Sequence, residues 1–171
     1  MLVTNYLVSG LNAGTLYSFT VQAVNSEGIS SASVPVSILA AEAPSAPAMP
    51  TTTIIGSNIH LSWVAPNSNG SPVFAYIITF KDSADEYHLV LDECNGSSAQ
   101  VVSTLQCVLP LSKMYSSPFN LILGDKIYAK IVAINSYGES LPSMPGSGAS
   151  VVLIPDAPSG LANNPALTNA N

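Results

Sequence analysis

One stretch of eight residues occurs twice in this chain, 110 residues apart. Residues 23–30 read AVNSEGIS, and residues 133–140 read AINSYGES. A second matching pair follows in the same order, because Ala43-Pro44-Ser45 returns as Ala157-Pro158-Ser159. A period of this length is the size of one small domain. The sequence therefore predicts a tandem array of small domains, with the chain cut out of register with the repeat.

Within each unit, apolar and polar residues alternate with a period of two, which is typical of half-buried β-strands. The apolar set of the first unit is Tyr17, Phe19, Val21 and Ala23, and the second unit has Ile59, Leu61 and Trp63, then Tyr76, Ile78 and Phe80. Gly, Pro and Asn clusters separate these runs, and residues 67–72 supply one such turn. No window has sustained helical spacing. We predict an all-β sandwich of short strands with almost no helix.

Charge is scarce, at 8% of residues against about 25% in an average domain. Only 4 residues are basic and 10 are acidic, so no basic stripe exists for nucleic acid. No uncharged apolar run reaches the ~20 residues that span a bilayer. A neutral, hydroxyl-rich surface favours association with further copies. An ordinary secreted module with polar turns fits the same composition.

The two cysteines, Cys94 and Cys107, are close in sequence. A metal site would need further ligands, and the only histidines, His60 and His88, have none at ligand spacing. We therefore predict a disulfide, no metal and no cofactor, in an oxidising compartment.

Two sequons match the acceptor rule for N-glycosylation, at Asn69-Gly70-Ser71 and Asn95-Gly96-Ser97. Asn-Gly is also a common turn dipeptide, so each match has a second interpretation as a plain turn. Together with the cysteines they favour an extracellular or cell-surface glycoprotein, although no signal peptide is recognised in the first residues.

Convergent titratable groups, which an enzyme requires, are missing from the pattern, so we predict no catalytic residues. His60 is expected to face solvent, and His88, beside Asp85 and Glu86, is either a mild pH responder or an exposed strand residue. Five acids crowd into twelve residues, which suits either a Ca²⁺ site or, as we predict, a solvated acidic edge. The five are Asp82, Asp85, Glu86, Asp92 and Glu93.

The same residues resemble the fibronectin type III family. Trp63, Ala65-Pro66, the turn at 69–72 and Tyr76-x-Ile78-x-Phe80 are similar to the first half of such a domain, and residues 10–28 are similar to its E to F turn and F strand. The resemblance implies an immunoglobulin-like β-sandwich in tandem repeat. It assigns residues 1–41 to strands E to G of a first domain, 42–46 to a linker, 47–154 to a complete domain with a cysteine-bearing insertion, and 155–171 to a linker and the first strand of a third repeat.

The second unit departs from the family pattern. Ile127 occupies the position of Tyr17, and Tyr128 should face the other side of its strand, so no tyrosine corner is expected there. The long segment 82–124, with its paired cysteines, resembles the repeats of large protist surface proteins.

These features predict a structural module of an extracellular fibre or cell-surface coat that packs on adjacent repeats or copies of itself. The family's Arg-Gly-Asp adhesion motif is absent from the matching loops. The alternative is an adhesion or glycan-binding accessory module of a receptor or secreted enzyme. That alternative needs a contact patch, for which the candidates are Tyr137, Tyr115 and Phe119.

Overall fold

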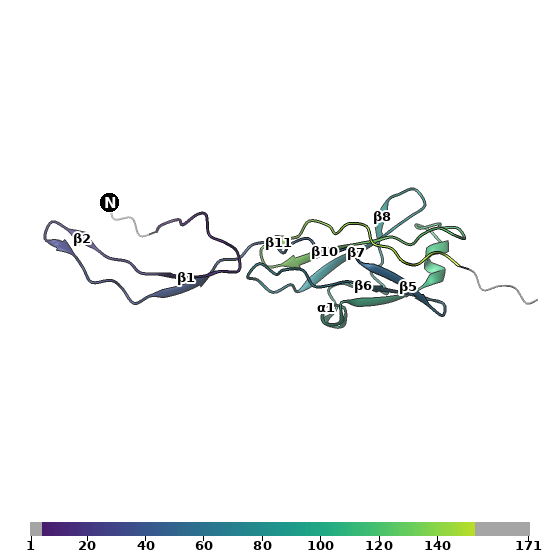
Figure 1. The fold of residues 1–171 in the computed structure, drawn as a ribbon, viewed down its shortest axis with the longest axis horizontal. Helices are drawn as coiled ribbons and strands as arrows, with labels where there is room; N and C mark the ends of the chain where they lie inside the picture. Colours follow the sequence, from purple (N-terminus) through teal and green to yellow (C-terminus); the bar gives the residue numbers. More distant parts are fainter. Residues whose placement is uncertain (1–4, 153–171) are drawn as a thin grey trace, which may run out of the picture.

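A computed structural model describes residues 5–152, in which a long β-hairpin is followed by a β-sandwich (Figure 1). The hairpin pairs β1 (Leu16–Phe19) with β4 (Val36–Leu39), and β2 (Val24–Asn25) with β3 (Gly28–Ile29), all antiparallel. No strand precedes β1 within residues 5–152, and the first four residues of the segment assigned to the predicted E strand lie outside the described range. The predicted start of a third repeat, at 155–171, lies outside the described residues.

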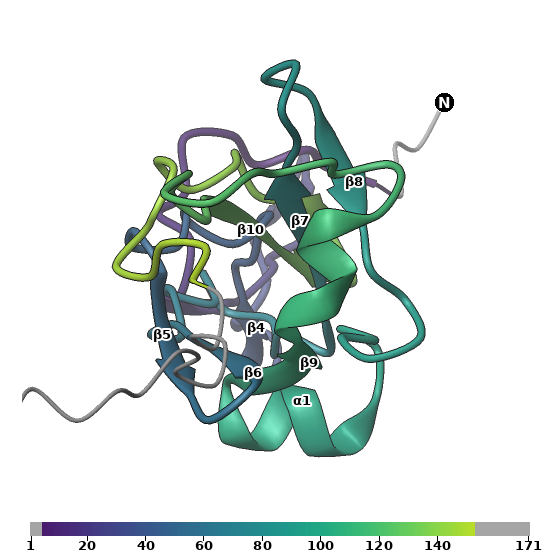
Figure 2. The same ribbon diagram turned by 90° about the vertical axis from the view of Figure 1, so that its right-hand side faces the viewer.

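The sandwich consists of two antiparallel sheets. One sheet has the order β5 (Thr51–Ile55), β6 (Asn58–Ser62) and β9 (Gln106–Pro110). The other has the order β11 (Gly138–Glu139), β10 (Ala129–Asn135), β7 (Ala75–Lys81) and β8 (Tyr87–Leu89). Figure 2 looks along the long axis and shows the two sheets facing each other.

The alternating residues of the second unit form the core between the sheets, as predicted. Ile59, Leu61 and Phe80 are fully buried, and Trp63 packs edge-on against Tyr76 with ring centroids 5.3 Å apart. Thr52 joins β5 to the segment before β10 through its hydroxyl, which donates to the carbonyl oxygen of Ile127 and accepts from Ala149 N. Burial on this scale is the main stabilisation of such a domain.

Two short helices occur among the described residues, in keeping with the expectation of almost no helix, and both lie in the long segment after β8. The α-helix α1 (Ala99–Thr104) begins where the Ser98 side chain accepts a hydrogen bond from Val101 N. The 3-10 helix η1 (Leu111–Tyr115) buries Leu111 and Met114 against the core. A helix of one or two turns has too few residues to show the three-and-four spacing that the sequence analysis sought.

The hairpin and the last two strands of the sandwich share one hydrogen-bond pattern at an offset of 110 residues. In the hairpin, the hydroxyls of Ser30 and Ser33 accept from Ala23 N and Val21 N. In the sandwich, the hydroxyls of Ser140 and Ser143 accept from Ala133 N and Ile131 N. The repeated sequence therefore folds into the same local structure in both places.

Burial distinguishes the two copies. Val21 is 74% exposed, whereas its counterpart Ile131 is fully buried beneath the opposing sheet. Phe19, Val21 and Ile38 line an open apolar recess of about 660 Å³ on the hairpin. The hairpin thus carries a core-type face that no second sheet covers within the described residues.

Candidate functional site at the junction of hairpin and sandwich

A cluster of backbone and side-chain hydrogen bonds lies where the hairpin meets the sandwich. Three backbone segments converge there: the end of the hairpin at Gly14 and Ala40, the linker at Glu42 and Ala43, and the turn at residues 67–71. Gly14 N donates to Ala40 O at 2.8 Å, and Glu42 N donates to Asn69 O at 3.1 Å. The linker is therefore hydrogen-bonded to the sandwich along its edge and is more than a spacer.

Asn135, the last residue of β10, holds this junction from inside. The residue is 2% exposed, and its Nδ2 donates to Glu42 O at 2.8 Å, to Ser68 O at 3.1 Å and to Ser71 O at 3.3 Å. Its Oδ1 accepts from Tyr137 N at 2.8 Å. One buried amide thus joins the linker, the 67–71 turn and the β10–β11 turn, and every polar atom of that amide is satisfied.

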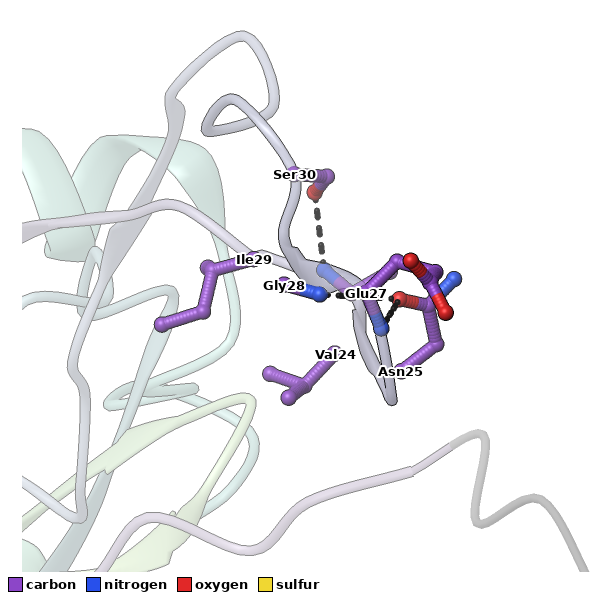
Figure 3. A pocket seen from close by; sticks show the side chains of 7 residues that line it. Val24, Asn25, Glu27, Gly28, Ile29 and Ser30 are labelled. Atoms are coloured by element: carbon purple, nitrogen blue, oxygen red, sulfur yellow. Dashed lines mark hydrogen bonds between the residues drawn. The ribbon is translucent and has the colours of Figure 1, made fainter.

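Asn25, the matching asparagine of the hairpin, makes side-chain hydrogen bonds with described residues only within its own turn. Figure 3 shows that Asn25 Oδ1 accepts from Glu27 N and Gly28 N, at 2.9 and 3.1 Å, so the local turn is the same. Asn25 is exposed, because this turn lies at the end of the hairpin away from the sandwich (Figure 1). The contrast shows that the Asn side chain builds the turn and that its surroundings decide whether it also joins two segments.

Asn69 and Gly70 complete the junction from the turn between β6 and β7. Asn69 Nδ2 donates to Ala43 O at 2.8 Å and to Glu42 Oε1 at 3.4 Å. A Cβ on Gly70 would lie 2.5 Å from Ala40 O, and φ is +85° there, so only glycine fits. The sequence analysis found this Asn-Gly pair as a turn and a sequon but did not find its contact with the linker.

The two cysteines form the predicted disulfide, which links the loop before α1 to β9 with 5.3 Å between Cα atoms. Asn95 and Gly96 lie inside this loop. Gly96 packs directly on the backbone of Tyr76 and accepts a hydrogen bond from Tyr76 N at 2.9 Å. Asn95 is exposed, and its Oδ1 accepts from Ser97 N at 3.0 Å.

The acidic cluster is divided among separate partners. Asp82 Oδ2 lies 2.7 Å from His88 Nε2, and this hydrogen bond holds the pKa of Asp82 below its ordinary value. Lys81 contacts Asp85 at 2.6 Å, and Lys113 contacts Glu93 at 2.8 Å. Each of these contacts raises the pKa of its lysine.

This division bears on the metal and pH interpretations of the cluster. Within residues 5–152, no three His, Cys, Asp or Glu side chains gather as metal ligands would. His88 pairs with Asp82 rather than with Asp85 or Glu86, and His60 lies half-buried on β6.

The three aromatic residues proposed as a contact patch do not come together. Phe119 is only 3% exposed and packs edge-on against His88, so its expected surface role is wrong. Tyr137 is 61% exposed beside β11, at the hairpin end of the sandwich (Figure 1). Tyr115 ends η1, where its hydroxyl donates to Val152 O at 2.6 Å near the opposite end. Sequence alone could not place these residues, because their separation depends on the whole sandwich.

Comparison with known proteins shows what the two parts resemble. Residues 2–38 match the family model of the fibronectin type III domain. Domains d3-d4 of the rat CD45 extracellular region align with a TM-score of 0.52 and 17% identity, over 85% of this chain and 70% of that one. The chain has the fibronectin type III fold. The order β11-β10-β7-β8 opposite β5-β6-β9 is its two-sheet arrangement.

Two further proteins are similar to this chain. Domains from titin align with a TM-score of 0.47 and 18% identity, over 77% of this chain and 39% of that one. A Kelch domain-containing protein of Saccharolobus solfataricus is 32% identical over 104 residues, which is 60% of this chain. The chain spans 14% of that relative's length. In the described fibronectin type III structure, no helix has the length and apolar character needed to cross a membrane.

Proposed function

We propose that this chain is part of a modular extracellular protein whose fibronectin type III units are stacked end to end in fixed orientation, with a mechanical rather than a catalytic role. The junction is the observation that carries the proposal. A flexible linker would leave the orientation of neighbouring units open, whereas this linker is held by Asn69 and Asn135 through backbone and side-chain hydrogen bonds. The extracellular setting is supported by the disulfide.

The far end of the sandwich supports repetition of the same junction. Gly124 N donates to Val151 O at 3.0 Å with φ +93°, as Gly14 N donates to Ala40 O with φ +75°. Among the described residues, nothing lies within 4 Å of a Cβ placed on Gly124. Ile122 and Leu123 beside it are 70% and 63% exposed. This end of the sandwich therefore has the same glycine-to-carbonyl backbone bond that lies at the junction beside Gly14, together with exposed apolar side chains against which a further unit could pack.

On a larger scale, we propose that the stacked units form a fibre or a cell-surface coat. The resemblance to the repeats of protist surface proteins is part of the same proposal. The adhesion or glycan-binding alternative is less well supported, because Tyr115 and Tyr137 lie at opposite ends and Phe119 is buried. Few charges, with 4 lysines against 10 acids, leave largely neutral surfaces for packing on neighbouring units or copies.

Electron microscopy of the native material tests the proposal. We expect filaments or an ordered layer with a regular axial repeat. Dispersed single molecules without such a repeat would contradict the structural role. Mass spectrometry with and without reduction adds an independent readout, since a free thiol at Cys94 or Cys107 in the native protein would contradict the oxidising compartment.

A further inference from the structure

The two sequons stand in opposite structural situations. N-glycosylation replaces one hydrogen of the asparagine Nδ2 with a sugar, so the surroundings of that atom decide whether a glycan fits. Asn69 Nδ2 directs its hydrogens at Ala43 O and Glu42 Oε1 of the linker. Asn95 is exposed, and its recorded side-chain hydrogen bond uses Oδ1 rather than Nδ2.

The backbone around Asn69 is equally constrained. Asn69 O accepts from Glu42 N, and Ser71, the third residue of the sequon, is only 6% exposed. Gly70 lies against Ala40 O and Gly14 N so closely that even a methyl group has no room. A sugar on Asn69 Nδ2 takes the place of a hydrogen that is directed at Ala43 O or at Glu42 Oε1, so it removes a contact with the linker and lies against it at that point.

We propose that Asn95 is the glycan acceptor of the folded chain, and that a glycan on Asn69 and the closed junction are mutually exclusive. Modification of Asn69 would then release the hairpin from its fixed orientation on the sandwich. Asn69 thereby serves as a junction residue whose modification is controlled by whether the junction is closed. The inference rests on the proposed extracellular setting for its occurrence in nature, but its chemistry is a property of the isolated chain.

The reaction has a simple balance. The anomeric carbon of a diphosphate-activated sugar breaks its bond to the phosphate oxygen and forms a bond to Nδ2. The amide nitrogen loses one proton, and the nucleoside diphosphate leaves. No oxidant, reductant or metal in the chain takes part. The probe for this transfer is a soluble N-glycosyltransferase with a nucleotide-activated glucose donor.

The test uses the full chain, produced in a host that adds no N-glycans, folded, and then exposed to that transferase. Peptides of residues 65–75 and 91–99 show whether each sequon is a substrate when no fold surrounds it. In the folded chain, we expect occupancy at Asn95 to exceed that at Asn69 by about tenfold or more, since modification of Asn69 requires local opening. Peptide mass spectrometry measures both sites.

Gly70→Ala provides the opening variant, because it keeps an Asn-x-Ser sequon while its methyl group collides with Ala40 O. Gly124→Ala is the matched control, with a similar positive φ but open space around it. We expect Asn69 occupancy to rise several-fold in Gly70→Ala and to stay at the wild-type level in Gly124→Ala. Asn135→Asp, which removes the donor to Glu42 O, should also raise Asn69 occupancy. This second variant keeps the test decisive if the Gly70→Ala chain fails to fold.

Three results would overturn the inference: equal occupancy of Asn69 and Asn95 in the folded wild type, an unmodified Asn95 in the folded chain beside a modified peptide, or an Asn69 that stays protected in both folded opening variants although its peptide is modified. None of them touches the stacked-array proposal, which the microscopy tests separately.

Discussion

The side-chain amide of Asn135 donates to the backbone carbonyl of Glu42 at 2.8 Å, across 93 residues of sequence. Because Glu42 belongs to the linker and Asn135 to β10, this bond attaches the linker to the sheet whose strands form half of the sandwich. The same amide also satisfies Ser68 and Ser71 of the neighbouring turn. A buried donor shared in this way is costly to lose, since the carbonyl oxygens of Glu42 and Ser71 would lose the hydrogen bond from this amide, while Ser68 O would keep the one from Ser71 N.

Asn135→Ala should therefore lower the free energy of unfolding by about 2–4 kcal/mol, because several buried polar groups lose their partner at once. Asn25→Ala is the matched control, since Asn25 makes the same local turn in an exposed position, and it should cost less than about 1 kcal/mol. Urea unfolding monitored by Trp63 fluorescence measures the Asn135→Ala cost, and far-ultraviolet circular dichroism reports the hairpin. Equal costs for both variants would show that the junction adds nothing to stability.

Replacing both cysteines, Cys94→Ala with Cys107→Ala, should destabilise the sandwich by about 2–3 kcal/mol, because a closed loop of 13 residues' separation no longer restricts the unfolded chain. Reductant should destabilise the wild type to a similar extent and leave the double variant unchanged. A wild type whose unfolding midpoint ignores reductant would argue against this stabilising role.

The paired positions Val21 and Ile131 test whether the hairpin face is covered. Ile131→Ala should cost about 2–5 kcal/mol, as expected for a fully buried aliphatic side chain. Val21→Ala should cost less than about 0.5 kcal/mol in this chain, because Val21 is mostly exposed. If Val21→Ala is as costly as Ile131→Ala in a longer form of the protein, that form supplies the missing sheet.

The Asp82 and His88 pair predicts a dependence of stability on pH. Because the folded-state pKa of Asp82 lies below its unfolded value, ionised Asp82 contributes stability above about pH 4, and this contribution is lost as pH falls through the folded pKa. Asp82→Asn should therefore be less stable than the wild type at pH 6, and the two should converge near pH 2. Thermal unfolding across that range measures the difference. A gap that persists unchanged at pH 2 would mean that the carboxylate charge is not responsible.

Several elements were accessible from sequence because their causes are local. The alternation through Ile59, Leu61 and Trp63 predicts a strand with one buried face, and the structure confirms this. The Asn69-Gly70 pair predicts a turn. In the structure both residues adopt positive φ, as such a turn requires. The repeat at an offset of 110 residues predicts a repeated unit, and the serine hydroxyls of both copies bond in the same way. The disulfide followed from the scarcity of other ligands.

Other features were decided by the tertiary structure alone, because they depend on which distant segments meet. Phe119 is an aromatic residue of the type found in exposed contact patches, yet the fold buries it against His88. Val21 and Ile131 have equivalent patterns, and only the presence of an opposing sheet separates an exposed side chain from a buried one. Asn69 and Asn95 carry the same three-residue signal, but one amide bonds to a linker 26 residues away while the other side chain lies exposed. Sequence determines the local hydrogen-bonding capacity of a residue, and the long-range packing of the chain determines which partner uses it.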